Sequence, residues 1–272
     1  MLRSMYSGVS GMRGFQTKLD VIGNNIANVN TAGFKAGRVM FKDIMSQTVA
    51  GVTAPNDGRG GVNPQQVGLG VAVAAIDTIH LGGSAMTTNS PLDLRIDGDG
   101  FFIVKMGEDQ GVPYLTRAGN FTVDADRNLV NADGLNVCDT GGTPIVIDGD
   151  AVSFSIGQDG YIMLTTADGE IEQGPQIGIA KVVNPAGLEK IGGNLYRMTA
   201  NANPGGALGE FFGGNDAENG TGAIITGQLE MSNVDLTNEF TEMIVAQRGF
   251  QANSRIITTS DEVLQEVVNL KR

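Results

Sequence analysis

The residues able to carry out chemistry are few in this 272-residue chain, which holds one histidine, His80, and one cysteine, Cys138. A single histidine leaves no spare partner for a Ser-His-Asp or Cys-His catalytic set, and it rules out HExxH and His-rich zinc sites. We therefore interpret His80 as a residue at a strand end. Cys138 is interpreted as a small buried apolar side chain rather than as a nucleophile.

Acidic pairs offer a second kind of chemistry, because carboxylates can hold a cation or act as a catalytic dyad. The segment 124–128 reads Asp-x-Asp-x-Asn, as an EF-hand calcium loop begins, but Leu129 stands where that loop requires Gly and Leu135 where it requires Glu. Asp97 and Asp99 are each followed by Gly, which is typical of hairpin turns rather than of a hydrolase dyad. Both acidic pairs are therefore predicted to be turns.

The glycine motifs do not predict a nucleotide site either. Gly68-x-Gly70 is followed by Val73 where a dinucleotide fingerprint needs Gly or Ala, and it precedes an alternating strand rather than a helix. No glycine run is followed by a Walker lysine. We predict no catalytic residue, no cofactor-binding residue and no metal ligand, and we expect that this protein is not an enzyme.

The strongest pattern lies in the elements at the two ends, where large apolar residues recur every seven positions. Such spacing predicts helices that pair as a coiled coil. In the C-terminal series, Phe240 is assigned to the same surface as Leu236, Met243, Phe250, Ile257 and Leu264. The N-terminal series has two neighbouring lines, made of Met5, Met12, Leu19 and Ile26, and of Phe15, Ile22 and Val29. We predict that all of these residues form an assembly interface.

The predicted helices run from Leu2 to about Asn28 and from about Asp235 to Leu270. Neither contains Pro, and the Asn-rich and Gly-containing segment 24–33 is typical of a helix end. Ser232-x-x-Asp235 is a candidate capping box at the start of the second helix. The β-branched run 256–259 indicates a possible kink or break near its middle.

The middle of the chain has period-two patterns separated by turn residues, which predict strands. Asp-Gly pairs begin at 97, 99, 133, 148, 159 and 168, and these suit the positive φ of tight hairpins. Strands are expected from 71 to 75, 101 to 106, 121 to 123, 145 to 147, 152 to 156, 161 to 164, 177 to 183 and 224 to 229. The expected fold class is α+β, with terminal helices pairing as a coiled coil around an all-β, sandwich-like or barrel-like middle domain.

The predicted division follows from these patterns. Residues 1–34 and 232–272 form the terminal helical domain, residues 35–70 a loop-rich connector, and residues 71–231 the outer β domain. Residues 51–227 hold eight Lys/Arg against twenty-one Asp/Glu, so the middle carries most of the net charge of −12. An acidic middle argues against nucleic acid or an anionic membrane as a ligand. No apolar run is long enough for a membrane span, and no cleavable signal peptide is expected.

Several strings carry a family resemblance. Residues 24–35, Asn-Asn-Ile-Ala-Asn-Val-Asn-Thr-Ala-Gly-Phe-Lys, are similar to the N-terminal signature of the bacterial flagellar axial proteins, which are rod and hook subunits. Segments 66–71, 92–104, 114–137 and 233–272 are similar to the same family, in the same order, so the resemblance covers essentially the whole chain. The residues carried over as the family motif are Asn24, Asn25, Asn28, Thr31, Gly33, Phe34 and Lys35.

The resemblance implies a helical tube at the bacterial cell surface that transmits torque. Its subunits are exported through the flagellar type III apparatus, and they polymerise beneath a cap. The implied partners are further copies of this chain, rod proteins, hook-filament junction proteins, the hook cap and the export apparatus, with no cofactor.

Three functions stay open at this point. The strings most resemble the short hook subunits of Gram-positive bacteria, which form a flexible joint, so we favour the hook. The alternative is the distal rod, a rigid drive shaft of similar length and domain content. A distant alternative is a secreted oligomeric hydrolase or carbohydrate-binding protein, although the absence of Trp weakens it because sugar sites usually need exposed aromatic rings.

Overall fold

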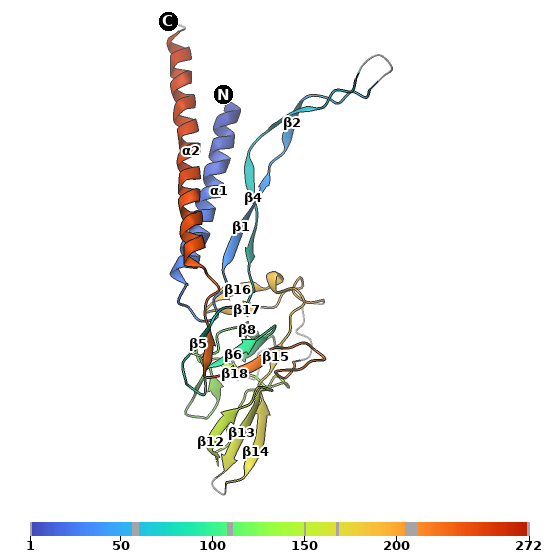
Figure 1. The fold of residues 1–272 in the computed structure, drawn as a ribbon, viewed down its shortest axis with the longest axis vertical. Coiled ribbons are helices and arrows are strands. Elements are labelled where there is room, and N and C mark those ends of the chain that lie inside the picture. The colour runs from blue at the N-terminus through green and yellow to red at the C-terminus, as the bar shows by residue number, and fades with distance from the viewer. Residues whose placement is uncertain are drawn as a thin grey trace. The chain divides into compact units, whose positions relative to one another are not determined.

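The structure is a computed structural model that describes residues 2–55, 60–107, 111–149, 151–166, 169–204 and 211–270 (Figure 1). A helix at each end and a β-rich middle confirm the predicted α+β class. The chain separates into two compact units. The helical unit comprises Met1–Ala27, Gly37–Thr78 and Asp235–Arg272, and the β unit comprises Asn28–Ala36 and Ile79–Val234.

Both predicted terminal helices are present, α1 over Leu2–Ala27 and α2 over Leu236–Asn269. Asp235 is the N-cap of α2, because its carboxylate accepts a hydrogen bond from the Thr237 amide at 2.9 Å. Ser232, proposed above as the first residue of a capping box, instead accepts from the Val234 amide at 3.4 Å.

The expected break at 256–259 is absent, since α2 runs through this segment without interruption. The hydroxyls of Thr258, Thr259 and Ser260 donate to the carbonyls of Arg255 and Ile256 at 2.7 to 3.2 Å. These hydroxyls therefore find acceptors inside the helix and do not draw the backbone into a non-helical turn.

The described part of the segment expected to be a loop-rich connector contains strands β1, β2 and β3, which corrects that prediction. Strand β1 (Gly37–Asp43) pairs with β4 (Val71–Thr78), and β2 (Ser46–Ala50) pairs with β3 (Gln65–Gly68), both antiparallel. Basic residues between 35 and 45 recur at steps of three and four rather than two, which hid the strand pairing of β1. The Gly, Asn and Pro residues of 55–64 obscured it, because the partner strand follows only after them.

The β unit contains an eight-stranded sheet with the order β16-β17-β8-β7-β11-β10-β9, in which β15 also pairs with β7. A second sheet has the order β12-β13-β14, and two further pairs are β18 with β6 and β19 with β5. The sheet strands are β7 (Phe101–Lys105), β8 (Tyr114–Thr116), β9 (Thr122–Val123), β10 (Leu129–Val130), β11 (Asn136–Val137), β15 (Ile179–Ala180), β16 (Glu189–Gly192) and β17 (Leu195–Arg197). The others are β5 (Ala85–Thr87), β6 (Leu94–Asp97), β12 (Ala151–Ile156), β13 (Tyr161–Thr166), β14 (Ile171–Gln176), β18 (Ala223–Thr226) and β19 (Gln228–Glu230).

The core of the β unit is built on β7, whose residues 101–104 are all buried. Phe102 packs edge-on against Phe121, with ring centroids 5.1 Å apart. The strand expected at 145–147 is not formed. Ile145 and Ile147 are buried, but Val146 forms only an isolated β-bridge, with Asn128.

The predicted turn glycines are confirmed at several positions. Gly98, Gly134, Gly160 and Gly169 have φ values of +124°, +78°, +83° and +83°, which residues with a side chain rarely adopt. Asp168, the first residue of the last Asp-Gly pair, lies outside the described residues. Asp97 and Asp99 therefore flank Gly98 at a bend that follows β6. The acidic segment 124–128 forms a turn, in which the Asp124 carbonyl accepts a hydrogen bond from the Arg127 amide at 2.9 Å.

Candidate assembly surface and junction

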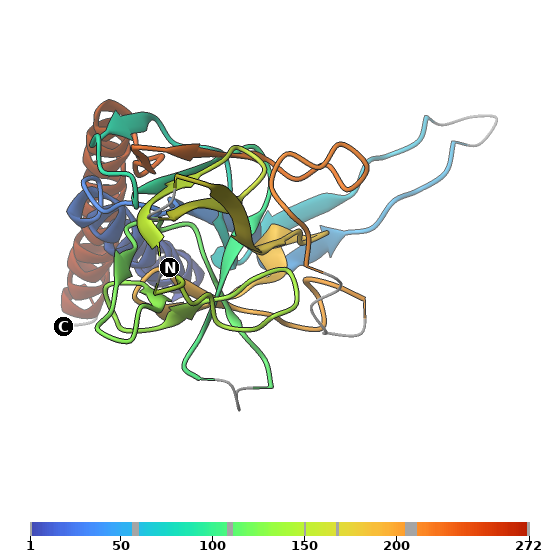
Figure 2. The same cartoon turned by 90° about the horizontal axis from the view of Figure 1, so that it is seen from below.

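Helices α1 and α2 lie antiparallel and side by side in the helical unit (Figures 1 and 2). Their contact depends on small residues. A Cβ added to Gly249 would lie 2.6 Å from the Phe15 ring, and one added to Gly11 would lie 2.7 Å from the Asn253 amide. Ala246, on the same face of α2, is fully buried. The two backbones therefore approach more closely than larger side chains would permit.

Polar groups flank this apolar contact. Asn25 is buried, and its side-chain amide donates to Glu239 Oε1 at 3.0 Å, while Lys18 forms an ion pair with Glu242. Burial raises the pKa of Glu239 above its ordinary value, although the hydrogen bond from Asn25 opposes that change. These interactions set the register of one helix along the other.

The large apolar residues predicted to form the assembly interface are only partly used in this contact. On α1, Ile22 is buried, and Met5, Met12, Phe15, Leu19 and Ile26 are half-buried, as is Val29 just beyond the helix. On α2, Met243, Ile257 and Leu264 are half-buried, whereas Leu236, Phe240 and Phe250 are exposed. Pairing of the two helices through the seven-residue series stays a prediction, because Ala246 and Gly249 lie at the observed contact.

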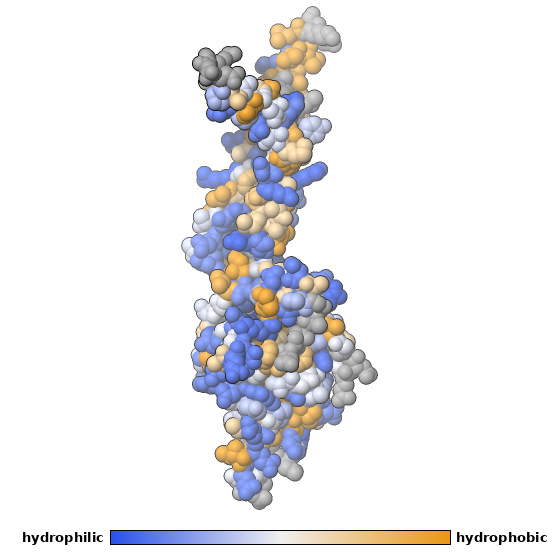
Figure 3. Space-filling model, turned by 90° about the vertical axis from the view of Figure 1, so that its right-hand side faces the viewer, coloured by the Kyte–Doolittle hydropathy of each residue, from blue (hydrophilic) through white to orange (hydrophobic). Residues whose placement is uncertain are grey.

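Helix α2 carries further exposed apolar residues that a search for one seven-residue repeat overlooked. Ile244 is exposed and follows the predicted residues Leu236 and Phe240 at four-residue steps along one flank. Val245, Ile256, Val263 and Val267 are also exposed and fall on another side of the helix. Figure 3 shows apolar side chains in orange among the polar ones along the helical unit. Exposed apolar surface on this scale is typical of a protein–protein interface.

The first residues of the family motif hold the end of α1. Asn25 donates from its side-chain amide to the Gly37 carbonyl at 2.8 Å and accepts from the Gly37 amide at 3.0 Å, which ties α1 to the start of β1. Thr31 donates to Asn28 Oδ1 at 3.2 Å, and its amide donates to the Asn28 carbonyl at 3.1 Å. Asn24 is exposed.

The later motif residues belong to the β unit. Gly33 has φ +72°, its amide donates to the Glu230 carbonyl at 2.8 Å, and an added Cβ would lie 2.6 Å from the Ala118 amide nitrogen. Phe34 is buried, with the Lys190 ammonium 4.0 Å from the centre of its ring. Gly33 is therefore required both for its backbone conformation and for the close approach.

Lys35, Arg117 and Glu230 form a buried ionic cluster in the β unit, which we call the Glu230 clamp. Glu230 Oε1 accepts from Lys35 Nζ at 2.6 Å and from the Gly83 amide at 2.9 Å, and Arg117 lies 3.4 Å from the other carboxylate oxygen. Lys35 also donates to the Leu81 carbonyl at 2.7 Å. The clamp thus joins three segments that are far apart in the sequence.

The charges of the clamp depend on one another. Burial acts to raise the pKa of Glu230, but Arg117, Lys35 and the Gly83 amide together hold it below its ordinary value. Burial lowers the pKa of Lys35, although Glu230 acts in the opposite direction. Sequence reasoning identified Lys35 and missed Glu230 as its partner. Arg117 did lie within one of the family strings, in the run Thr-Arg-Ala-Gly-Asn-Phe.

His80 lies two residues after β4, as expected for a residue at a strand end. Its ring makes edge contacts with Phe101 and Tyr196, with centroids 5.7 and 5.5 Å apart. Burial, followed by the nearby cations Lys35, Arg117 and Lys190, lowers the pKa of His80 to about 4. His80 is therefore neutral at physiological pH.

Cys138 is buried, as expected, and burial raises the pKa of its thiol to about 11, so the thiolate needed for nucleophilic attack is scarce at neutral pH. Within the described part of the chain, no three His, Cys, Asp or Glu residues are placed to hold a metal ion. Among the described residues, no helix is long and apolar enough to cross a membrane.

Three protein-family models match the chain. The model described as flagella basal body rod protein matches residues 5–35, the flagellar hook protein FlgE/F/G D1 domain matches residues 95–164, and the flagellar basal body rod FlgEFG protein C-terminal model matches residues 225–270.

Several curated relatives match this chain over their full length. The flagellar basal-body rod protein FlgG of Bacillus subtilis is 56% identical over 272 residues, which is all of both chains. In Borreliella burgdorferi, a protein of the same name is 37% identical over 278 residues, and the flagellar hook protein FlgE is 31% identical over 450, again covering both chains completely. The chain thus belongs to the rod and hook family of bacterial flagellar proteins, which are structural components of the flagellum.

Proposed function

We propose that this chain is a distal rod subunit, the alternative that the sequence analysis left open beside the hook. The observation that carries the proposal is the match to the Bacillus subtilis rod protein at 56% identity over 272 residues, with both chains covered completely. The hook relative from Borreliella burgdorferi is 31% identical, and its alignment extends over 450 residues. The rod relative therefore matches this chain at higher identity than the hook relative does, and over an alignment of the same length as the chain.

Helices α1 and α2 are proposed to form the inner layer of a tube, with the β unit outside. Support comes from the apolar residues that α2 leaves exposed, including Phe240 at 50% and Val267 at 51%. Burial of such residues between copies provides a driving force of about 25 cal/mol per Å². Further partners are adjoining axial proteins and the flagellar export apparatus.

The hook, which the sequence strings favoured, is less well supported than the rod by these relatives. The family matches do not support a hydrolase or a carbohydrate-binding protein, because the family to which the chain belongs is structural.

Complementation distinguishes rod from hook. The chain is expressed in a flagellated bacterium that lacks its own FlgG-type rod protein, and separately in one that lacks its FlgE-type hook protein. We expect swimming, and basal bodies with a complete straight rod in electron micrographs, only in the first strain. Restoration of a curved hook in the second strain alone would reverse the assignment.

A variant of the helical unit tests whether incorporation into the rod depends on the paired helices. Gly249→Leu places a large side chain against Phe15, where even a Cβ would lie 2.6 Å from the ring. This variant is expected to be produced and to leave the β unit folded, yet to fail in complementation. Normal rods built from Gly249→Leu protein would contradict the proposed role of the paired helices.

A further inference from the structure

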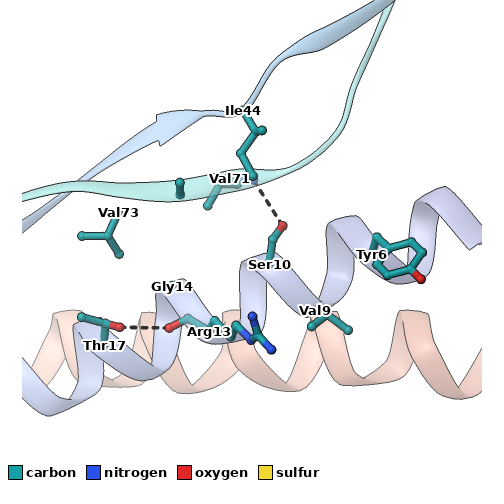
Figure 4. Close-up of a pocket in the computed structure, with 10 residues that line it drawn as sticks. Tyr6, Val9, Ser10, Arg13, Gly14, Thr17, Ile44, Val71 and Val73 are labelled. Atoms are coloured by element: carbon teal, nitrogen blue, oxygen red, sulfur yellow. Dashed lines mark hydrogen bonds between the residues drawn. The ribbon is translucent and has the colours of Figure 1, made fainter.

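A groove of about 500 Å³ lies in the helical unit between α1 and the β1–β4 pair (Figure 4). Val9 of α1 and Val71 and Val73 of β4 give it apolar walls. The Ser10 hydroxyl accepts a hydrogen bond from the Val71 amide at 3.3 Å and donates to the Ser7 carbonyl at 2.8 Å, which fixes the strand to the helix. The groove is thus held open by the chain itself.

The same chain's α2 does not fill this groove. Helix α2 packs against the face of α1 that carries Gly8, Gly11 and Phe15. Val9, Arg13 and Thr17 line the groove and fall on the opposite side of α1, given 3.6 residues per turn. An occupant must therefore come from elsewhere.

The charged residues of the groove indicate which kind of segment would bind there. Arg13 is exposed in the groove and forms no ion pair with any described residue. The only other charged residues between Leu2 and Leu19 are Arg3 and Lys18, so this part of α1 is wholly cationic. A complementary segment presents aliphatic side chains together with carboxylates.

The C-terminal end of α2 has this chemistry and lacks a neighbour on α1. Contacts of Gly8 with Ile257 and of Phe15 with Gly249 place Leu2 opposite roughly Glu262, so residues 263–269 extend about 10 Å beyond α1. In this overhang Val267 and Val268 are 51% and 68% exposed. Glu262 and Glu266 are exposed and form no ion pair within the described residues, while Lys271 and Arg272 lie outside them.

We propose that the groove of one copy receives the α2 overhang, residues 263–269, of a second copy. The inference rests on the proposed function, since it specifies how copies of this subunit join. Groove and overhang are different surfaces of one chain, so the contact is heterologous. Each added copy leaves one groove and one overhang open, and the assembly grows as a filament instead of closing as a dimer.

Charge reversal tests the pairing in the complementation strain that lacks its own rod protein. We expect Arg13→Glu and Glu266→Arg each to reduce the number of complete rods at least about tenfold, because like charges then face each other, and the double variant to restore them. Glu172→Arg, a charge reversal at an exposed position of β14 in the β unit, is the matched control and should assemble normally. Single variants that assemble as well as this control would overturn the groove contact while leaving the rod assignment intact.

Engineered cysteines test the geometry directly in isolated rods. In a Cys138→Ala background, Tyr6→Cys with Val268→Cys should give a ladder of disulfide-linked multimers on mild oxidation. Tyr6→Cys with Val152→Cys, which is a 74% exposed position in β12, should give none. A single dimer band would indicate a closed contact, and absence of cross-links in rods that do form would also refute the proposal. Failure of the unmodified chain to form rods would instead refute the proposed function.

Discussion

Replacing Glu230 by Gln should destabilise the β unit more than any other single change in the buried ionic cluster. The substitution keeps the shape of the side chain but removes its charge. Lys35, Glu230 and Arg117 have side chains that are 1%, 2% and 6% exposed, so water cannot replace the lost carboxylate. Two cations would then be buried near each other without an anion between them.

The magnitude follows from this burial. Removing one partner of a buried ion pair costs about 3–5 kcal/mol, because the other charge stays buried and unpaired. Lys35→Met should cost less, about 1–3 kcal/mol, since Glu230 keeps Arg117 and the Gly83 amide as partners. Glu189→Gln is the control: it breaks an exposed pair with Arg197, which water screens, so its effect on stability should be small.

Urea unfolding of the full chain provides the assay, followed by the near-ultraviolet circular dichroism of its tyrosines. Tyr196 is buried in the β unit and reports on its folding. With a urea dependence of about 1–3 kcal/mol per molar, the Glu230→Gln midpoint should fall by about 1–5 M. If Glu230→Gln shifted the midpoint no further than Glu189→Gln does, the reasoning about buried, mutually dependent charges would be wrong.

Three further outcomes are expected. Gly249→Ala should weaken packing of α2 on Phe15 and lower the melting temperature of the helical unit. Gly23→Ala is the matched control, because nothing lies within 4 Å of its added Cβ, and it should stabilise α1 by up to about 1 kcal/mol. Equal melting temperatures of the two variants would contradict the contact between Gly249 and Phe15. The β unit should lose stability as the pH falls from about 6.5 towards 4, because His80 binds its proton in the unfolded chain before it does so in the folded one. His80→Phe should flatten that part of the curve in pH-dependent urea titrations, and an unchanged slope would exclude His80 as its source. Phe250→Ala should stop rod formation while lowering the stability of the free subunit less than loss of a fully buried Phe would, because Phe250 is 37% exposed there. A loss of subunit stability as large as that for a fully buried Phe would show that this ring is already packed in the single chain.

The sequence predicted the elements whose signals are local. Apolar residues at helical spacing, without Pro, identified α1 and α2 almost to their observed ends. Asp-Gly pairs identified turns with positive φ, such as the one at Gly160. These patterns succeed because helix and turn propensities depend on neighbouring residues. The motif strings identified the family as well, whereas the proposal of a rod rather than a hook rests on full-length relatives.

Only the tertiary structure decided which surfaces meet. The periodicity of α2 predicted an apolar face, yet close approach to α1 occurs at Ala246 and Gly249, where the lack of large side chains lets the backbones approach. Strand β1 pairs with β4, which begins more than thirty residues after the start of β1 and beyond a segment whose composition is typical of loops. Lys35 and Glu230 are separated by 195 residues and meet at 2.6 Å. Such contacts depend on shape and charge between distant segments, and local spacing carries little information about them.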